Sequence, residues 1–216
     1  MNSHHFTFYG VAAEARASGV LWLPEERVLC VSDLHLGKSD RLARRGVALL
    51  PPYETDDTLA RLSREVGRLN PRKVICLGDS FDDLLSVEAL SDTNTATVAA
   101  MQAGREWIWI EGNHDPGPVN VGGSHQFEIS VSGLTFCHIA TPRRGEVSGH
   151  FHPKHGLRGT GPARACFVYD SDRLIMPAFG TFTGGLSCAD PAIRTLLGAK
   201  AIAVLTGRKA IPVPLK

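Results

Sequence analysis

The stretch Val28-Leu29-Cys30-Val31-Ser32-Asp33-Leu34-His35 runs from a short apolar segment straight into a D-x-H motif. Its four β-prone apolar residues predict a buried strand that stops at Ser32-Asp33. Alternate residues of an extended segment share one face, so we expect Asp33 and His35 to point at one ion while Leu34 points into the core. A carboxylate and an imidazole on one face predict a site for a divalent metal ion.

Other predicted strands end in polar residues of the same kinds. Gly78-Asp79 follows one strand, and Gly112-Asn113-His114-Asp115 follows another. His138 ends a later strand, and Gly149-His150-Phe151-His152 comes after the next. Since the carboxyl ends of strands meet at one crevice of an α/β sheet, we expect these side chains to gather there. Their mixture of carboxylate, imidazole and amide oxygen is typical of sites for manganese, iron or zinc.

Apolar periodicity and turn residues predict the elements around these motifs. Strands are expected at 28–31, 73–77, 107–110, 127–131, 134–138, 146–148, 165–169 and 173–176, with a closing hairpin at 201–205 and 211–213. Helices are expected at about 54–69 and 86–103. This order predicts an α/β fold in which two sheets pack face to face with helices outside. We see no linker in the sequence, so residues 1–216 are expected to form one domain.

The amino-acid composition favours a folded soluble protein over a membrane-spanning or secreted one. The chain has 216 residues, and its 43% hydrophobic and 21% charged residues are ordinary for a folded soluble protein. Neither a long apolar run nor a signal-like start is present, so no membrane span or secretion signal is predicted. Five scattered cysteines without a C-x-x-C pair favour a reducing compartment, and we expect a cytoplasmic protein. The net charge of +1 by itself does not indicate a nucleic-acid partner.

The motif order D-x-H, G-D-x-x-D, G-N-H-D, H and G-H-x-H resembles that of the calcineurin-like metallophosphoesterase superfamily. The resemblance implies a four-layer αββα sandwich with a two-metal centre. It implies a first ion held by Asp33, His35, Asp79 and His152, and a second ion held by Asp79 as a bridge, Asn113, His138 and His150. It also makes His114 an acid or transition-state stabiliser outside both ligand sets, oriented by Asp115. Manganese is the expected ion, with iron or zinc as alternatives.

Four longer segments of the sequence resemble one particular family within this superfamily. Those at 33–38, 77–81, 149–153 and above all 176–185 are similar to the ligase-associated DNA damage response endonucleases, also called PdeM. The similarity runs from about residue 28 to residue 190, and it implies DNA repair together with an ATP-dependent DNA ligase and a helicase. Relatives usually carry His where Asp82 stands and Glu-Pro where Ile139-Ala140 stands, and we expect these neighbours to line the substrate cleft. From its residues alone, 176–185 is expected to be a buried tight loop.

The expected chemistry is hydrolysis of a phosphate ester. Two ions about 3.5–4 Å apart can share a hydroxide that attacks phosphorus, while His114 protonates the leaving oxygen. A DNA-cleaving phosphodiesterase is one hypothesis. The alternative is a hydrolase of a small phosphorylated molecule, such as a nucleotide, a dinucleotide or a sugar-lipid pyrophosphate. A non-enzymatic module is disfavoured because every ligand position and His114 are present, and the oligomeric state stays open.

Basic residues directly follow two of the motifs. They are Lys38, Arg41 and Arg44 after the first motif, and Arg143 and Arg144 after His138. These residues could grip flanking phosphates of DNA, or they could form a solvated face balanced by nearby carboxylates. The remaining histidines are expected in exposed loops or the tail, and they are His4, His5, His125 and His155.

Overall fold

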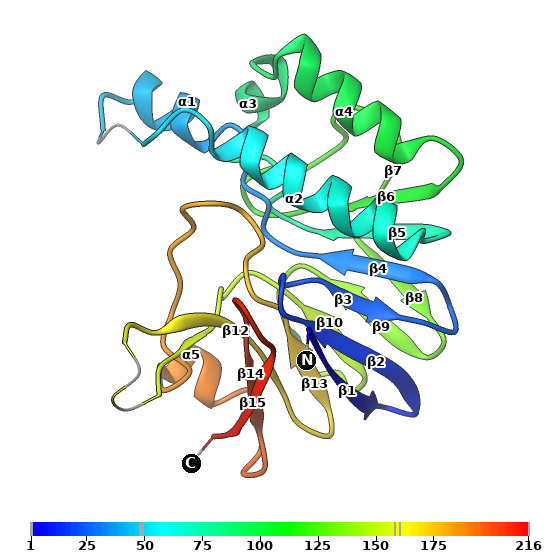
Figure 1. Cartoon of the computed structure of the whole chain (residues 1–216), viewed down its shortest axis with the longest axis vertical. Coiled ribbons are helices and arrows are strands. Elements are labelled where there is room, and N and C mark those ends of the chain that lie inside the picture. The colour runs from blue at the N-terminus through cyan, green and yellow to red at the C-terminus, as the bar shows by residue number, and fades with distance from the viewer. Residues whose placement is uncertain (1, 48–49, 158, 160, 216) are drawn as a thin grey trace.

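The computed structural model describes residues 2–47, 50–157, 159 and 161–215, and shows two β-sheets with helices outside them (Figure 1). The first sheet has seven strands in chain order. They are β1 (Ser3–Phe8), β2 (Val11–Arg16), β3 (Leu21–Leu23), β4 (Val28–Val31), β5 (Lys73–Leu77), β6 (Glu106–Ile110) and β7 (Ser124–Gln126). Strands β4 to β7 are parallel neighbours, so β4, β5 and β6 end at the same edge of the sheet.

The second sheet has eight strands in the order β15-β14-β12-β13-β10-β9-β8, with β11 paired to β12. They are β8 (Glu128–Val131), β9 (Leu134–Cys137), β10 (Glu146–Ser148), β11 (Lys154–His155), β12 (Arg164–Tyr169), β13 (Arg173–Ile175), β14 (Ile202–Leu205) and β15 (Ile211–Pro214). Strand β10 lies parallel to both β9 and β13. The carboxyl ends of β9 and β10 therefore also lie together.

Helices cover the outer faces of the two sheets unequally. Four of them gather over the first sheet, and short α5 lies beside the second (Figure 1). The helices are α1 (Lys38–Arg44), α2 (Glu54–Leu69), α3 (Leu84–Glu88), α4 (Asp92–Gln102) and α5 (Pro191–Arg194). Helix α2 packs inward because Leu59, Leu62 and Val66 recur on one face, where all three are buried.

The helix predicted over 86–103 is wrong as a single element. The segment covers the end of α3 and the whole of α4, and each of these helices begins at its own N-cap residue. Asp83 accepts a hydrogen bond from Ser86 N at the start of α3, and Ser91 accepts one from Asn94 N at the start of α4. A second N-cap side chain inside the segment therefore starts a new helix instead of continuing the first.

Three apolar cores separate four layers. The central core joins side chains of both sheets, including Ile75 and Ile108 from the first and Phe136 and Phe167 from the second. A second core lies between the first sheet and helices α2 and α4, and a third lies between the second sheet and α5. The predicted αββα sandwich is confirmed, with one outer layer reduced to a four-residue helix and loops.

The first three strands were not predicted, and the four histidines expected outside elements were wrongly placed. His4 and His5 lie in β1, His125 lies in β7, and His155 lies in β11. Short strands with alternating small residues, such as β2 with buried Ala13 and Ala15, carry a weak apolar signal. Their place in the sheet comes from pairing with neighbouring strands.

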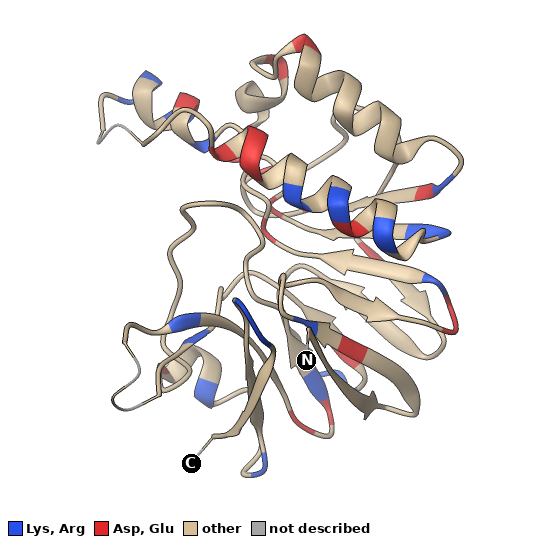
Figure 2. Ribbon diagram, viewed as in Figure 1, with Lys and Arg blue, Asp and Glu red and all other residues tan. Residues whose placement is uncertain are grey.

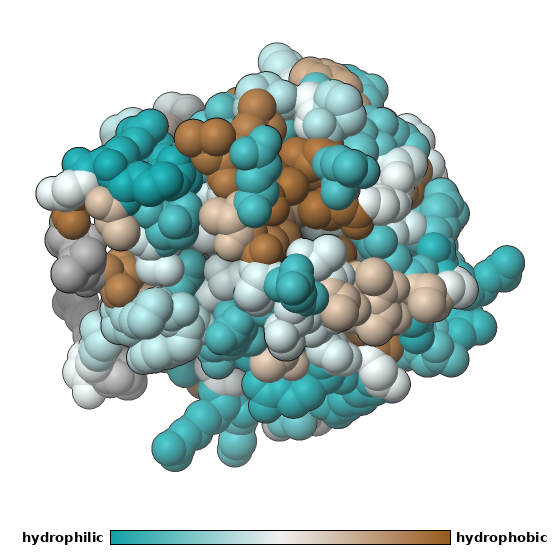
Figure 3. Space-filling model, turned by 90° about the horizontal axis from the view of Figure 1, so that it is seen from above, coloured by the Kyte–Doolittle hydropathy of each residue, from teal (hydrophilic) through white to brown (hydrophobic). Residues whose placement is uncertain are grey.

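The face of the molecule in Figure 3 is mostly hydrophilic, and the cysteines form no disulfide within the described residues. Seen from above, the molecule shows an interrupted hydrophobic area within a mostly hydrophilic surface (Figure 3). Within the described ranges, no helix combines the length and the apolar character that a membrane crossing requires. All five cysteines are free and buried, and Cys166 Sγ lies 3.5 Å from Cys188 Sγ.

Candidate metal centre

The candidate ligands lie where strands of both sheets end. From the first sheet, Asp33 and His35 follow β4, Asp79 follows β5 and Asn113 follows β6; from the second sheet, His138 follows β9, and His150 and His152 follow β10. Parallel pairing of β4 with β5, β5 with β6 and β9 with β10 puts these loops at shared edges. The fold thereby brings together residues that are more than a hundred positions apart, such as Asp33 and His150.

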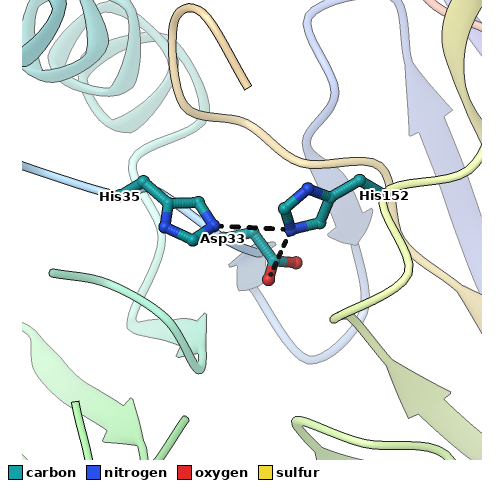
Figure 4. A group of neighbouring side chains, drawn as sticks. All are labelled: Asp33, His35 and His152. Atoms are coloured by element: carbon teal, nitrogen blue, oxygen red, sulfur yellow. Dashed lines mark hydrogen bonds and ion pairs between the residues drawn. The ribbon is translucent and has the colours of Figure 1, made fainter. Parts of the chain in front are cut away.

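Asp33, His35 and His152 form a first cluster of ligand atoms (Figure 4). His152 Nε2 lies 3.0 Å from Asp33 Oδ1 and 3.4 Å from His35 Nε2. Asp33 is fully buried, and its Oδ1 accepts no hydrogen bond from any described residue. A buried carboxylate oxygen without a hydrogen bond, facing two imidazole nitrogens, fits a cation held among the three side chains.

Asp79, His138 and His150 form a second cluster. His138 Nε2 lies 3.4 Å from Asp79 Oδ2, 3.3 Å from His150 Nδ1 and 3.1 Å from Asn113 Oδ1. His138 Nδ1 lies 3.1 Å from the carbonyl oxygen of Leu77, to which it can donate its proton. That hydrogen bond would leave Nε2 as a lone-pair donor surrounded by other ligand atoms, which is the arrangement a metal-binding imidazole has.

The two clusters adjoin each other. His138 Nδ1 lies 4.0 Å from Asp33 Oδ1, and the backbone nitrogen of His150 donates to Asp33 Oδ2 over 3.1 Å. Burial raises the pKa of Asp33, but the close approach of His152 Nε2 to its carboxylate and the charges of His152 and His138 outweigh burial and lower it. The pKa of Asp79 is also lowered, because interactions with His138 and His114 outweigh its burial. Both carboxylates are therefore ionised and suited to cations.

The backbone at five candidate ligands is left-handed. The φ angles are 53° at Asp33, 46° at His35, 46° at Asp79, 69° at His150 and 47° at His152. The prediction that D-x-H is an extended segment is therefore wrong. Each such residue costs about 1–3 kcal/mol and persists only where the surrounding structure enforces it, and strain of this kind collects at functional sites. Here left-handed turns, and not the pleat of a strand, aim alternate side chains at one point.

Two glycines allow loops to approach the ligands closely. A Cβ at Gly112 would collide with the backbone nitrogen and the carboxylate of Asp79. A Cβ at Gly149 would collide with the hydroxyl of Ser32 and the carboxylate of Asp33. Neither glycine has a positive φ, so the need for glycine comes from space and not from backbone conformation.

Asp82 does not line a cleft, contrary to the expectation from the sequence. Its side chain is 1% exposed, with Oδ1 2.8 Å from His35 Nδ1 and Oδ2 2.8 Å from Arg41 Nη1. The first contact fits a proton on His35 Nδ1, which leaves Nε2 free to bind a metal ion. Burial raises the pKa of Asp82, but the two hydrogen bonds outweigh burial and lower it to about 2.

His114 lies at the edge of the first cluster. The centre of its ring is 5.2 Å from that of His35, and its backbone nitrogen donates to Asp79 Oδ1 over 2.9 Å. Its Nδ1 lies 2.9 Å from the carbonyl oxygen of Asp82. The orientation that we predicted from Asp115 comes instead from this carbonyl group.

Asp115 ties two ligand loops together. Its carboxylate accepts hydrogen bonds from the backbone nitrogens of Ser80 and Phe81, which follow Asp79, and from that of Gly112. Burial raises the pKa of Asp115 to about 6, while the backbone donors oppose the rise. Asp115 thus positions the loops after β5 and β6, and through them the candidate ligands.

The basic residues predicted from the sequence are mostly paired with carboxylates. Arg41 Nη1 lies 2.8 Å from Asp82 Oδ2, and Arg44 Nη2 lies 2.8 Å from Asp83 Oδ1. Arg143 pairs with Glu128 and Glu146, and Arg144 Nε lies 3.1 Å from Asp172. Lys38 has no ion pair within the described part of the chain. These contacts agree with the interpretation as a balanced surface.

An apolar hollow borders the second cluster. It has a volume of about 300 Å³, and Asn113, His138, Phe127 and Ile139 are among its lining residues. Phe127 is 74% exposed and Ile139 is 46% exposed. The expectation that Ile139 lines a cleft beside the ligands agrees with this position.

The loop over 176–185 supports the D-x-H segment. Phe179 N donates to Ser32 O over 2.8 Å, and Gly180 N donates to Asp33 O over 3.0 Å. Only its first half is buried, since Phe182 and the residues from Gly184 to Ser187 are exposed. The prediction of a buried loop is thus correct for 176–180, the part that touches the first cluster.

Fold and site together define a class, the metal-dependent phosphoesterases, in which ligands from two packed sheets gather at one edge. The chain matches the family described as calcineurin-like phosphoesterase over residues 26–172, more than half of its length, and it belongs to that family. The crystal structure of Pseudomonas putida nuclease MPE is similar, with a TM-score of 0.75 and 28% identity over 98% of this chain and 100% of that chain. Comparison with curated proteins finds no match.

Proposed function

We propose that the protein is a two-metal phosphodiesterase that cleaves DNA as an endonuclease. The observation that carries the proposal is the adjacency of two ligand clusters, whose nearest carboxylate and imidazole atoms, Asp33 Oδ1 and His138 Nδ1, are 4.0 Å apart. Similarity to a bacterial nuclease along almost the whole chain supports nucleic acid as the substrate.

The chain's own residues divide into ligands and a proton donor. We propose that Asp33, His35 and His152 hold one ion, that Asn113, His138 and His150 hold the other, and that Asp79 bridges them. When bound, two such ions lower the pKa of a shared water and neutralise charge on the phosphate oxygens. Manganese is the proposed ion, with iron and zinc as alternatives.

His114 is the proposed general acid. The carbonyl oxygen of Asp82 holds its Nδ1, so Nε2 is the atom that can pass a proton to the leaving oxygen. Such proton transfer typically contributes about 10²–10⁴-fold to the rate. Asp115 contributes indirectly by holding the loop that carries His114.

The cellular setting is part of the proposal. Action in DNA repair beside an ATP-dependent DNA ligase and a helicase is supported by the resemblance of the sequence motifs, and a cytoplasmic location by the scattered, free cysteines. The proposed role of Lys38, Arg41, Arg44, Arg143 and Arg144 in substrate binding requires that four of them exchange carboxylate partners for phosphates.

A small phosphorylated molecule is the second candidate substrate. Two observations favour it: the arginines beside the site are already neutralised, and an apolar hollow of about 300 Å³ borders Asn113 and His138. Such a hollow suits one base or another apolar group of a compact substrate.

A manganese-dependence assay with two substrates tests the function. Bis(p-nitrophenyl) phosphate and a single-stranded oligonucleotide are incubated separately with wild type and with His114→Ala, and the metal content of both proteins is measured. We expect manganese-dependent cleavage of both substrates by wild type, with a ~10²–10⁴-fold loss in the variant at equal metal content. Cleavage of the small diester alone would move the function to the second candidate. Loss of metal from the variant would make His114 a ligand.

A further inference from the structure

A groove leads away from the first ligand cluster along helix α2. A hollow of about 250 Å³ beside His152 is also lined by Arg61, Lys154 and residues of the loop after β13. A hollow of about 580 Å³ continues it and is lined by Arg61, Arg64 and Arg68. Both hollows include Arg61, as well as Ser18 and Thr206, so they meet there.

The cations of this groove are spaced along one helix face. Arg61, Arg64 and Arg68 stand at positions i, i+3 and i+7 of α2 and therefore lie on the same side of it. Blue segments recur from the middle of this helix to its end, interrupted by one red segment, whereas its first turn is red (Figure 2). Seven residues of helix span about 10 Å, which corresponds to about three nucleotides of one DNA strand.

The outer cations of the groove are not neutralised. Arg64 Nε reaches the carbonyl oxygen of Ala60 at 3.4 Å, and neither Arg64 nor Arg68 has an ion pair with a described residue. Lys154 Nζ donates to the carbonyl oxygen of Thr183 and not to a carboxylate. Free positive charge is thus present here, in contrast to the paired arginines beside the first motif.

The acidic residues near the groove are already occupied. Glu65 Oε2 lies 2.9 Å from Arg16 Nε, and Asp57 Oδ2 lies 3.0 Å from Arg61 Nε. Arg208 and Lys209 directly follow Gly207, a lining residue, and both are exposed. The residues that line the groove therefore carry more positive than negative charge, since the three arginines of α2 and Lys154 stand against Glu65 alone.

Arg61 fixes the junction between the two hollows. Its Nη2 donates to Phe179 O over 2.6 Å and to Thr181 Oγ1 over 2.8 Å, and its guanidinium carbon lies 4.5 Å from the centre of the Phe179 ring. These contacts join α2 to the loop that supports Asp33. The groove and the first ligand cluster therefore share one rigid wall.

We propose that this groove is a binding track for the DNA strand that flanks the scissile phosphate, with Lys154, Arg64 and Arg68 contacting successive phosphates. The inference rests on the proposed nuclease function. It adds a surface that a DNA strand would contact and that a small phosphate ester is too short to reach. Phosphate contacts by unpaired Lys and Arg position a strand without reading its sequence, so the track is expected to be sequence-independent.

Removal of two exposed arginines tests the track. The variant Arg64→Ala/Arg68→Ala is compared with Arg64→Lys/Arg68→Lys, which keeps the charge, and with Arg72→Ala/Lys200→Ala. The latter removes two exposed cations that line neither hollow. Affinity for a fluorescent single-stranded oligonucleotide is measured by anisotropy at several salt concentrations, and cleavage of DNA is compared with that of bis(p-nitrophenyl) phosphate.

We expect the alanine pair to bind DNA roughly tenfold more weakly at low salt and to lower the slope of log affinity against log salt by about 1.4, which is 0.7 for each lost contact. The ratio of DNA cleavage to diester cleavage should fall with the affinity, and the lysine pair should restore it. If wild type cleaves DNA and the alanine pair matches the Arg72→Ala/Lys200→Ala control in affinity and slope, the track is wrong and the nuclease function stands. If wild type cleaves only the diester, both are wrong.

Discussion

The candidate ligands His35 and His138 differ in the chemical group that faces the Nδ1 atom of the imidazole ring. His35 Nδ1 faces the carboxylate of Asp82, whereas His138 Nδ1 faces the carbonyl oxygen of Leu77. Both contacts fix the ring and favour a free Nε2, but a carboxylate also makes the imidazole a stronger electron donor. Asp82 therefore acts on the first cluster through its contact with His35.

Removal of Asp82 should weaken metal binding at the first cluster. We expect Asp82→Ala to lower the affinity there by 10–100-fold, because His35 loses its orienting partner. Competition with a chelator, followed by metal analysis, measures this affinity. Asp82→Asn, which keeps an acceptor oxygen, should lose less. Equal affinities of wild type and Asp82→Ala would show that His35 needs no such partner.

The left-handed backbone at His150 predicts an unusual order of stabilities. A residue with a Cβ is strained at φ 69°, whereas glycine is not. In the presence of EDTA, His150→Gly should therefore be more stable than His150→Ala by about 1 kcal/mol. Urea unfolding of the two variants measures the difference. A more stable alanine variant would contradict the strain that we infer at this position.

At the scale of elements, the loop after β13 supports the candidate ligands although it carries none of them. Its backbone donates to the carbonyl oxygens of Ser32 and Asp33, and the ring of Phe179 contacts Arg61 of α2. The loop therefore holds the D-x-H turn from one side, while Asp82 holds His35 from another. Its apolar, small residues fit this narrow position.

A methyl group at Gly180 should disturb this contact. A Cβ there would collide with the carbonyl group of Leu34, which belongs to the D-x-H turn. We expect Gly180→Ala to lower the free energy of unfolding by about 1–3 kcal/mol and to reduce metal content. Urea unfolding and metal analysis measure both effects. Gly184→Ala is the control, because no heavy atom lies within 4 Å of its Cβ position. Equal stability of the two variants would show that the loop can move aside.

At the scale of the whole molecule, the two sheets share one core. Side chains of β5 and β6 contact the same buried cluster as those of β9 and β12. The candidate metal centre lies at the edge where loops of both sheets meet, so neither sheet alone contains both candidate clusters. We therefore infer that residues 1–216 act as a single domain.

The shared core predicts one cooperative unfolding transition. With the metal removed by EDTA, the calorimetric and van't Hoff enthalpies of unfolding should agree, because separation of the sheets would expose the central core of each. Differential scanning calorimetry measures both values. Two separate transitions would instead indicate that the sheets fold independently.

Much of this protein could be predicted from local sequence. Strands β4 and β5 and helix α2 have the predicted bounds, because apolar periodicity is a property of neighbouring residues. The gathering of the candidate ligands at one place was also predictable, since strand ends in an α/β fold meet at one edge.

Other features depended on contacts between distant residues. The pairing of Arg41 with Asp82 joins positions 41 apart, and it gives a residue that we predicted to contact substrate a partner within the protein. Arg64 and Arg68 stay unpaired among the described residues although they resemble any other helix arginines in sequence. Local sequence determined which elements form and where chemistry collects, whereas the tertiary structure decided which charges are free, because pairing depends on what the fold brings within a few ångströms.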